Sequence, residues 1–166
     1  VRDANGKASK LKGALCLGSL DFTYNAHNWI ARGHFDYGHL GDAEEVRLLP
    51  GRQTKTSPFN RDYVGKAAIA CGLEAGYNLF SQIEKLRADD QKLYAFARYE
   101  YYNSYIPTAT QPQFPYTAKN RLAVGLNYYP IPQIVIKAEY SHRFLKRQYN
   151  NEPSVSLGVA YEGVFL

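Results

Sequence analysis

The chain has 166 residues, enough for one ordinary domain, and its net charge of +5 arises from basic and acidic residues that interleave along the sequence. Because the basic residues are not clustered as on a nucleic-acid-binding surface, nucleic acid is not an expected partner. No stretch comes near the roughly 18 consecutive apolar residues of a transmembrane helix. That excludes a helical span but not the weaker, alternating signal of barrel strands.

Seven stretches of the chain alternate apolar residues with polar or small ones, a period of two that predicts β-strands with two different faces. Turn-forming residues rather than helix caps bound each stretch. Most of the stretches are long for a globular protein but suit tilted membrane-spanning strands, which need roughly 9–11 residues. The predicted strands span residues 10–22, 28–41, 63–80, 92–105, 119–129, 134–146 and 154–165.

The connections between the predicted strands differ in length. Residues 23–27 (TYNAH) and 130–133 (PIPQ) are short, whereas 42–62 is long and polar and 106–118 is long and rich in Pro. Short periplasmic turns and longer outer loops are typical of outer-membrane barrels. If the chain ends on the periplasmic side, both short connections fall on that side. The pattern therefore favours an antiparallel, up-and-down transmembrane β-barrel.

Two connections of intermediate length, residues 81–91 and 147–153, fit this alternation less well. The first of them, SQIEKLRADDQ, could form a single helical turn. The long segment 42–62 leaves two alternatives open, because it is either a solvated loop or a loop that folds inward as a constriction. Its basic residues are Arg47, Arg52, Lys55 and Arg61.

The strand predicted at 134–146 shows the two faces most clearly, since Ile136 and Ala138 alternate with Lys137 and Glu139. A soluble β-sandwich, which buries its apolar face, would produce the same alternation. The aromatic residues favour a membrane barrel, in which aromatic girdles flank a band of smaller apolar residues. We expect Trp29, Tyr77, Tyr128 and Phe165 at the periplasmic ends of the strands, and Tyr63, Tyr101, Tyr140 and Phe144 toward the outer ends.

The number of strands predicts an incomplete barrel. Bacterial barrels have an even number of strands, and seven cannot close one. The sequence also contains no Met, although a translation product begins with one. We therefore expect a single domain over residues 1–166 that is the C-terminal portion of a larger barrel. Residues 1–9 would be the tail of an outer loop, and 10–166 would be strands and loops.

Two stretches carry a family resemblance. RLAVGLNYYPIPQIVIKAEYSHRF, residues 121–144, resembles the penultimate hairpin of the phosphate-selective porin O and P family. SVSLGVAYEGVFL, residues 154–166, is similar to the terminal strand that the outer-membrane insertion machinery recognises. The resemblance covers about residues 10–166. The chain departs from the family in two ways, because Leu166 follows the usual terminal Phe and the polar face mixes acidic with basic residues.

The resemblance implies a homotrimer of barrels of the roughly 16-stranded porin size, located in the cell outer membrane. Its partners would be outer-membrane lipid and, through the C-terminal strand, the barrel insertion machinery. A basic lumen would draw in anions, with phosphate as one candidate solute.

Together these features predict a porin, a passive and water-filled channel for small polar or anionic solutes. Charged lumen residues would orient polar solutes and raise the local concentration of anions. Arg98, Lys137 and Arg143 are the best candidates for anion contact. The alternative is cross-strand pairing with Glu100 and Glu139, worth about 0.2–1 kcal/mol per pair. The predicted channel-lining residues are Arg32, Lys66, Arg98, Arg121, Lys137, Arg143, Glu100 and Glu139.

An enzyme, a metal site and a cofactor are not expected. The four His residues lack metal-ligand spacing, and the sequence has no G-x-S-x-G, no phosphate-cradling Gly loop and no C-x-x-C. Two other classes of protein stay open. One is a soluble or secreted β-barrel that binds a ligand in a Tyr-rich interior. The other is a small surface barrel that acts as an anchor or adhesin.

Overall fold

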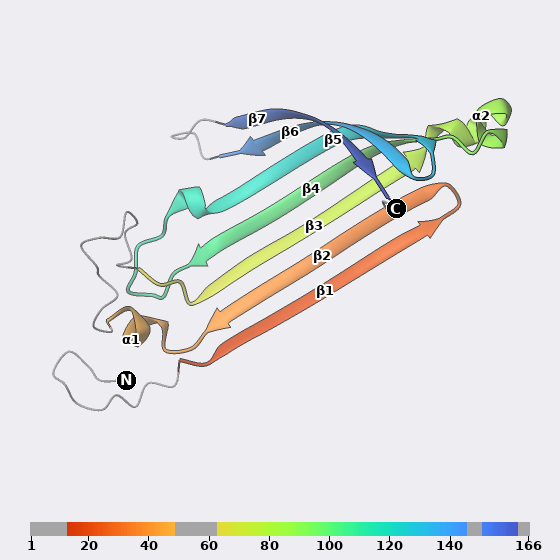
Figure 1. The fold of residues 1–166 in the computed structure, drawn as a ribbon. Helices are drawn as coiled ribbons and strands as arrows, with labels where there is room; N and C mark the ends of the chain where they lie inside the picture. Colours follow the sequence, from red (N-terminus) through yellow and green to blue (C-terminus); the bar gives the residue numbers. More distant parts are fainter. Residues whose placement is uncertain (1–12, 49–62, 146–150, 163–166) are drawn as a thin grey trace. The chain divides into compact units, whose positions relative to one another are not determined.

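The structure, a computed structural model, describes residues 13–48, 63–145 and 151–162. Seven strands form one antiparallel sheet whose spatial order follows the chain, so that β1 and β7 are its edges (Figure 1). All seven predicted strands are confirmed in an up-and-down arrangement. The strands are β1 (Leu15–Ala26), β2 (Trp29–Leu40), β3 (Ala67–Asn78), β4 (Lys92–Ile106), β5 (Ala118–Ile131), β6 (Ile134–Phe144) and β7 (Glu152–Tyr161).

The first hairpin differs from the prediction. Strand β1 continues to Ala26, so the connection expected at 23–27 is wrong, and the turn consists of His27 and Asn28 alone. Both turn residues have positive φ, 53° and 65°. A two-residue turn of this kind is a type I′ turn, whose twist matches that of the strands it joins. The predicted start of this strand at residues 10–12 lies outside the described residues.

The connection from β3 to β4 is helical, as the sequence suggested for 81–91. It contains the 3₁₀ helix η1 (Leu79–Gln82) and the short helix α2 (Glu84–Ala88). Asn78, which is only 7% exposed, ends β3 and fixes this connection. Its side-chain Oδ1 accepts hydrogen bonds from the backbone N–H of Phe80 at 3.2 Å and of Leu93 at 3.1 Å.

The other connections bring three differences from the predicted boundaries. A short helix, α1 (Ala43–Arg47), follows β2 and was not predicted, whereas Arg52, Lys55 and Arg61 lie outside the described residues. The 3₁₀ helix η2 (Pro115–Thr117) precedes β5. Strand β7 begins at Glu152, two residues before its predicted start at 154.

The chain divides into two compact units. The first unit comprises Val1–Leu20, Phe35–Ala70 and Tyr102–Ala118. The second unit comprises Asp21–His34, Cys71–Tyr101 and Lys119–Leu166.

Contacts between neighbouring strands show which residues share a face. In the first unit, the Ser19 hydroxyl donates a hydrogen bond to Asp36 at 2.7 Å, and the Leu17 side chain lies against Gly38. Because these residues alternate along β1 and β2, they fix one face of both strands. We call the face that carries Ser19 and Asp36 the polar face.

The polar face of the second unit follows from the same kind of contact. The His34 ring lies over Gly72, and the Arg98 guanidinium pairs with Glu74. Arg121 pairs with Glu100 in turn. The antiparallel registers of β5 with β6 and of β6 with β7 extend the face to the last strand.

All charged residues of the described strands lie on one face of the sheet. The opposite face, which we call the apolar face, carries no Asp, Glu, Lys or Arg in any strand. All charged strand residues belong to the polar face: Asp21, Arg32, Asp36, Glu74, Lys92, Arg98, Glu100, Lys119, Arg121, Lys137, Glu139, Arg143 and Glu152.

The sheet has little core of its own. Within the described ranges no large side chain is fully buried, and the buried apolar residues are Ala43, Ala67, Ala123 and Val135. Large residues of the apolar face are exposed instead, for example Leu126 at 44% and Leu157 at 80%. The fold therefore presents a wide apolar surface that nothing in the described chain covers.

Candidate functional site

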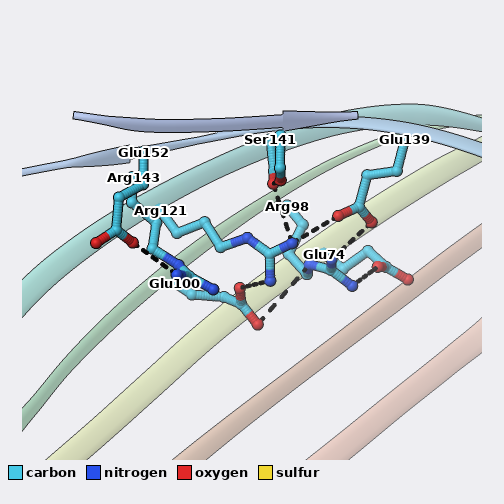
Figure 2. A network of polar contacts seen from close by, with 9 residues as sticks. Glu74, Arg98, Glu100, Arg121, Glu139, Ser141, Arg143 and Glu152 are labelled. Atoms are coloured by element: carbon cyan, nitrogen blue, oxygen red, sulfur yellow. Dashed lines mark hydrogen bonds and ion pairs between the residues drawn. The ribbon is translucent and has the colours of Figure 1, made fainter. Parts of the chain in front are cut away.

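A network of charged side chains crosses the polar face of the second unit (Figure 2). We call Glu74, Arg98, Glu100, Arg121 and Glu139 the charged network. These residues come from four consecutive strands, β3 to β6. Their side chains are between 16% and 26% exposed, so they are largely withdrawn from water without being sealed from it.

Glu139 is the centre of the charged network. One of its carboxylate oxygens accepts a hydrogen bond from Arg98 Nη2 and the other accepts one from Arg121 Nη2, each at 2.7 Å. Charge-assisted hydrogen bonds of this length are among the strongest in proteins. One carboxylate on β6 therefore holds two guanidinium groups from β4 and β5.

The outer contacts of the charged network are longer. Arg121 Nη1 reaches Glu100 at 3.2 Å, Arg98 Nη1 reaches Glu74 at 3.4 Å, and Arg98 Nε lies 3.8 Å from Glu100. The Nε donors of both arginines are buried and have no hydrogen-bond partner among the described residues. Because its one contact in the charged network is the long one to Arg98, Glu74 keeps most of its hydrogen-bonding capacity unused.

A glycine in the sheet leaves space beside the charged network. Gly125 lies directly opposite Glu139 in the pairing of β5 with β6. A Cβ at Gly125 would collide with the Ala138 carbonyl oxygen and with the Phe96 ring. The missing side chain therefore leaves room for Phe96 beside the charged network.

Arg121 also lies opposite Arg143, a like-charged pair that would be destabilising if the two side chains extended toward one another. They diverge instead. Arg121 turns to Glu139 and also donates to the buried Ser141 hydroxyl at 3.1 Å. Arg143 pairs with Glu152 of β7 at 2.7 Å, which ties the edge strand to β6.

The structure brings together four of the eight predicted lining residues: Arg98, Arg121, Glu100 and Glu139. Arg98 pairs with Glu139, in line with the alternative to anion contact, whereas Arg143 pairs with Glu152, a partner that the sequence did not suggest. The charged network has two arginines and three glutamates, so its formal charge is one negative. The charges of these residues therefore nearly compensate one another, and the charged network is not basic.

The other predicted lining residues lie apart from the charged network's ion pairs. Arg32, Lys66 and Lys137 make no ion pair with any residue that the structure describes. Lys66 immediately precedes β3, and its backbone joins neighbouring strands through hydrogen bonds to Leu40 and Ile106, both at 2.8 Å. Lys137 is an exposed residue of β6 opposite Asn127 and Gly158.

Sequence reasoning missed Glu152 as a residue of the polar face. Glu74 and Ser141 were expected on that face by strand alternation but were not among the predicted lining residues. Glu152 was assigned to a connection, yet it continues the alternation of Ser154 and Ser156, which was the available signal. Ser141 joins β6 to β7 through a hydroxyl contact with Ser154 at 2.8 Å.

Each unit also has a hollow lined mainly by polar-face residues. The hollow of the first unit has a volume of about 560 Å³ and is lined largely by small residues such as Gly38, Ala68 and Ala70. The hollow of the second unit has a volume of about 320 Å³ and is lined by charged residues that include Arg32 and Glu74. Of these two hollows, only the second is lined by charged residues of both signs.

A second polar cluster, in the first unit, joins two connections. Glu44 of α1 accepts hydrogen bonds from Gln111 at 2.8 Å, Thr108 at 2.9 Å and Arg47 at 2.7 Å. We call these four residues the loop cluster. Hydrogen bonds from Gln111 and then from Arg47 lower the pKa of Glu44 to about 2. The carboxylate is therefore ionised at any ordinary pH, and Gln111 is held almost fully buried.

The described residues contain no group of His, Cys, Asp and Glu arranged to hold a metal ion. Among the helices of the described chain, none is both long and apolar enough to cross a membrane. Comparisons of the chain with protein-family models, characterised proteins and solved structures found no match.

Proposed function

We propose that this chain forms part of an outer-membrane β-barrel that acts as a porin, a passive and water-filled channel for small polar solutes. One observation carries the proposal, namely that every charged residue of the seven described strands lies on the polar face. Charge on the lipid side of a barrel costs about 2–4 kcal/mol per Arg or Lys at the bilayer midplane. Because of this cost, the lipid-facing surface of a barrel carries few charged residues, whereas its water-filled lumen can carry many.

The exposure of the apolar face supports contact with lipid. Its residues include Ile136 at 45%, Val155 at 74% and Leu157 at 80% exposure. Soluble monomers rarely leave apolar patches wider than a few hundred Å² open to water. In a bilayer the same surface needs no protein cover, and strands paired within a barrel satisfy their backbone groups.

Aromatic residues at one end of the second unit fit an interfacial girdle. The rings of Trp29 and Tyr77 are 4.9 Å apart, and those of Phe80 and Tyr128 are 5.9 Å apart. The Tyr128 hydroxyl also donates a hydrogen bond to Gln91 in the connection before β4, at 2.8 Å. Rings of this kind, apolar in body and polar at the tip, favour the membrane–water interface.

The open order of seven strands means that the proposed barrel includes further strands. The family resemblance would make the whole a homotrimer of roughly 16-stranded barrels, inserted through its last strand. The negative formal charge of the charged network gives no support to a phosphate-selective lining. The proposal is therefore limited to small polar solutes.

Contact with lipid can be tested with Trp29, the only Trp of the chain, which is 48% exposed on the apolar face. In liposomes, acyl chains brominated near the headgroup should quench its fluorescence, whereas aqueous iodide should have a weaker effect. A matched control moves the fluorophore to the polar face by combining Trp29→Phe with Ser156→Trp, which should invert the preference. Stronger quenching of Trp29 by iodide, or a protein that stays soluble without detergent, would favour the soluble barrel.

Channel function is tested by the conductance of the full-length protein in planar bilayers. Steady open-channel steps are expected, and Lys137→Glu should shift ion selectivity toward cations, whereas Lys85→Glu in α2 should not. If Lys137→Glu shows channel steps with unchanged selectivity, the protein is a channel but Lys137 does not line it. A folded, inserted protein without steps would instead favour the anchor or adhesin.

A further inference from the structure

We propose that the charged hollow of the second unit binds a small dipolar solute, one that carries an acidic and a basic group as an α-amino acid does. The hollow lies on the polar face between β1 and β4, with a volume of about 320 Å³. The inference rests on the proposed function, because it names the solute class for part of the same lining. It is carried by Arg32, His34, Glu74 and Glu100.

The sheet register places Arg32 between Thr23 and Glu74. The backbone hydrogen bond from Asn78 N–H to Asn28, at 2.9 Å, and the contact of His34 with Gly72 set β2 against β3, so that Arg32 lies opposite Glu74. On the other side, the tight hairpin brings Thr23 beside Arg32.

Arg32 is the acid-binding end of the hollow. Its cross-strand neighbour Glu74 turns away from it toward Arg98, and Arg32 makes no ion pair or hydrogen bond with any described residue. A guanidinium has five N–H donors in a planar fork that matches a carboxylate. The Thr23 hydroxyl and the His34 ring line the same hollow and add polar groups beside that fork.

Glu74 and Glu100 are the amine-binding end. The Glu74 carboxylate has a single 3.4 Å ion pair with Arg98, which is long compared with the 2.7 Å contact that Arg98 makes to Glu139. Both glutamates line the hollow together with Asp21. An ammonium group with three donors could therefore approach Glu74, whose carboxylate has no contact shorter than 3.4 Å with the charged side chains of the described residues.

The balance of charge excludes simpler solutes as the best fit. The lining holds two basic residues, Arg32 and Arg98, and three acidic ones, Asp21, Glu74 and Glu100. An anion alone would meet the carboxylates of Glu74 and Glu100 as well as Arg32, and a cation alone would leave Arg32 without a partner. A dipolar solute can pair with Arg32 and with Glu74 at the same time, because groups of both charges line the hollow.

The size of the hollow limits the solute to a small one. A volume of about 320 Å³ is at the lower end of the roughly 300–1,000 Å³ of ligand pockets. Gly72 leaves space for the His34 ring, because a Cβ at that position would collide with the ring.

Binding should be measured by titration calorimetry on the full-length protein in detergent, with three probes that each have three carbon atoms: L-alanine, propionate and propylammonium. L-Alanine should bind saturably and at least about tenfold more tightly than either singly charged probe, since it alone forms charge-assisted contacts at both ends. Arg32→Gln should weaken L-alanine about tenfold, whereas Lys85→Gln should leave its binding unchanged.

Three results would overturn the inference. L-Alanine could fail to bind, propionate could bind as tightly as L-alanine, or Arg32→Gln could bind L-alanine like the wild type. Glu74→Gln, which should weaken L-alanine and propylammonium but not propionate, keeps the test decisive if Arg32→Gln does not fold. Conductance is measured separately from binding. Binding without channel steps would contradict the proposed function alone, and channel steps without binding would contradict this inference alone.

Discussion

The charged network of the second unit and the loop cluster of the first unit are each organised by one carboxylate, but they are built differently. Glu139 holds two arginines that strand alternation delivers to the same face. Glu44 holds the neutral donors Gln111 and Thr108, together with its helix neighbour Arg47. The first arrangement is dictated by a regular sheet, and the second depends on the path of two irregular connections.

The difference has an energetic consequence. Removing the central carboxylate of the charged network leaves two guanidinium groups with only the longer contacts to Glu74 and Glu100. Removing the carboxylate of the loop cluster frees mainly uncharged donors. Breaking a partly buried ion pair costs more than losing neutral hydrogen bonds, because an uncompensated charge remains.

The largest expected effect is therefore that of Glu139→Gln. We expect a loss of about 2–4 kcal/mol in the free energy of unfolding, below the roughly 3–5 kcal/mol of a fully buried pair because Arg98 and Arg121 remain about a quarter exposed. Urea unfolding of the detergent-folded protein, followed by circular dichroism, measures it.

Two matched substitutions decide whether the comparison holds. Glu45→Gln, at an exposed position of α1, should leave stability nearly unchanged, and Glu44→Gln should cost less than Glu139→Gln. Equal losses at Glu44 and Glu139 would show that the two guanidinium groups relax into water. The charged network would then contribute no more than ordinary surface pairs.

A second test alters the space beside the charged network instead of its charges. Gly125→Ala should destabilise the protein by about 1–3 kcal/mol, because the added methyl collides with the Ala138 carbonyl oxygen, which belongs to the backbone and cannot turn aside. Gly158→Ala on β7 is the matched control, since no atom lies within 4 Å of its added Cβ. Similar midpoints of urea unfolding for both variants would contradict a tightly packed network.

The side of the sheet on which the charged network lies was predictable from the sequence. Alternation alone placed Arg98, Glu100, Arg121 and Glu139 on one face, because side chains in a strand repeat every two residues. It could not say which carboxylate each arginine would meet. That choice depends on strand register, and register is set by the two-residue turns and by the irregularity between Tyr128 and Ile131.

The loop cluster was not predictable, because no periodic pattern links its members. Glu44 and Thr108 are separated by 64 residues and belong to two different connections of the sheet. Helix α1 was missed for a related reason. It has only five residues, too few to show a helical period, and it begins after Asp42, whose φ of 51° is unusual for a residue other than Gly.

The smallest expected effect is a pH dependence of the loop cluster. The pKa of Glu44 in the folded protein, about 2, lies below its usual value of 4.5, chiefly because of the hydrogen bond from Gln111. Since the folded pKa is the lower one, the stabilisation is fully present above about pH 4.5 and is lost as pH falls toward 2. The NMR signals of the Gln111 side-chain amide should therefore titrate with a midpoint near pH 2, and should not titrate in Glu44→Gln. A midpoint near 4.5 in the wild type would mean that Gln111 does not hold the carboxylate, and the loop cluster would then be an open contact between two solvated connections.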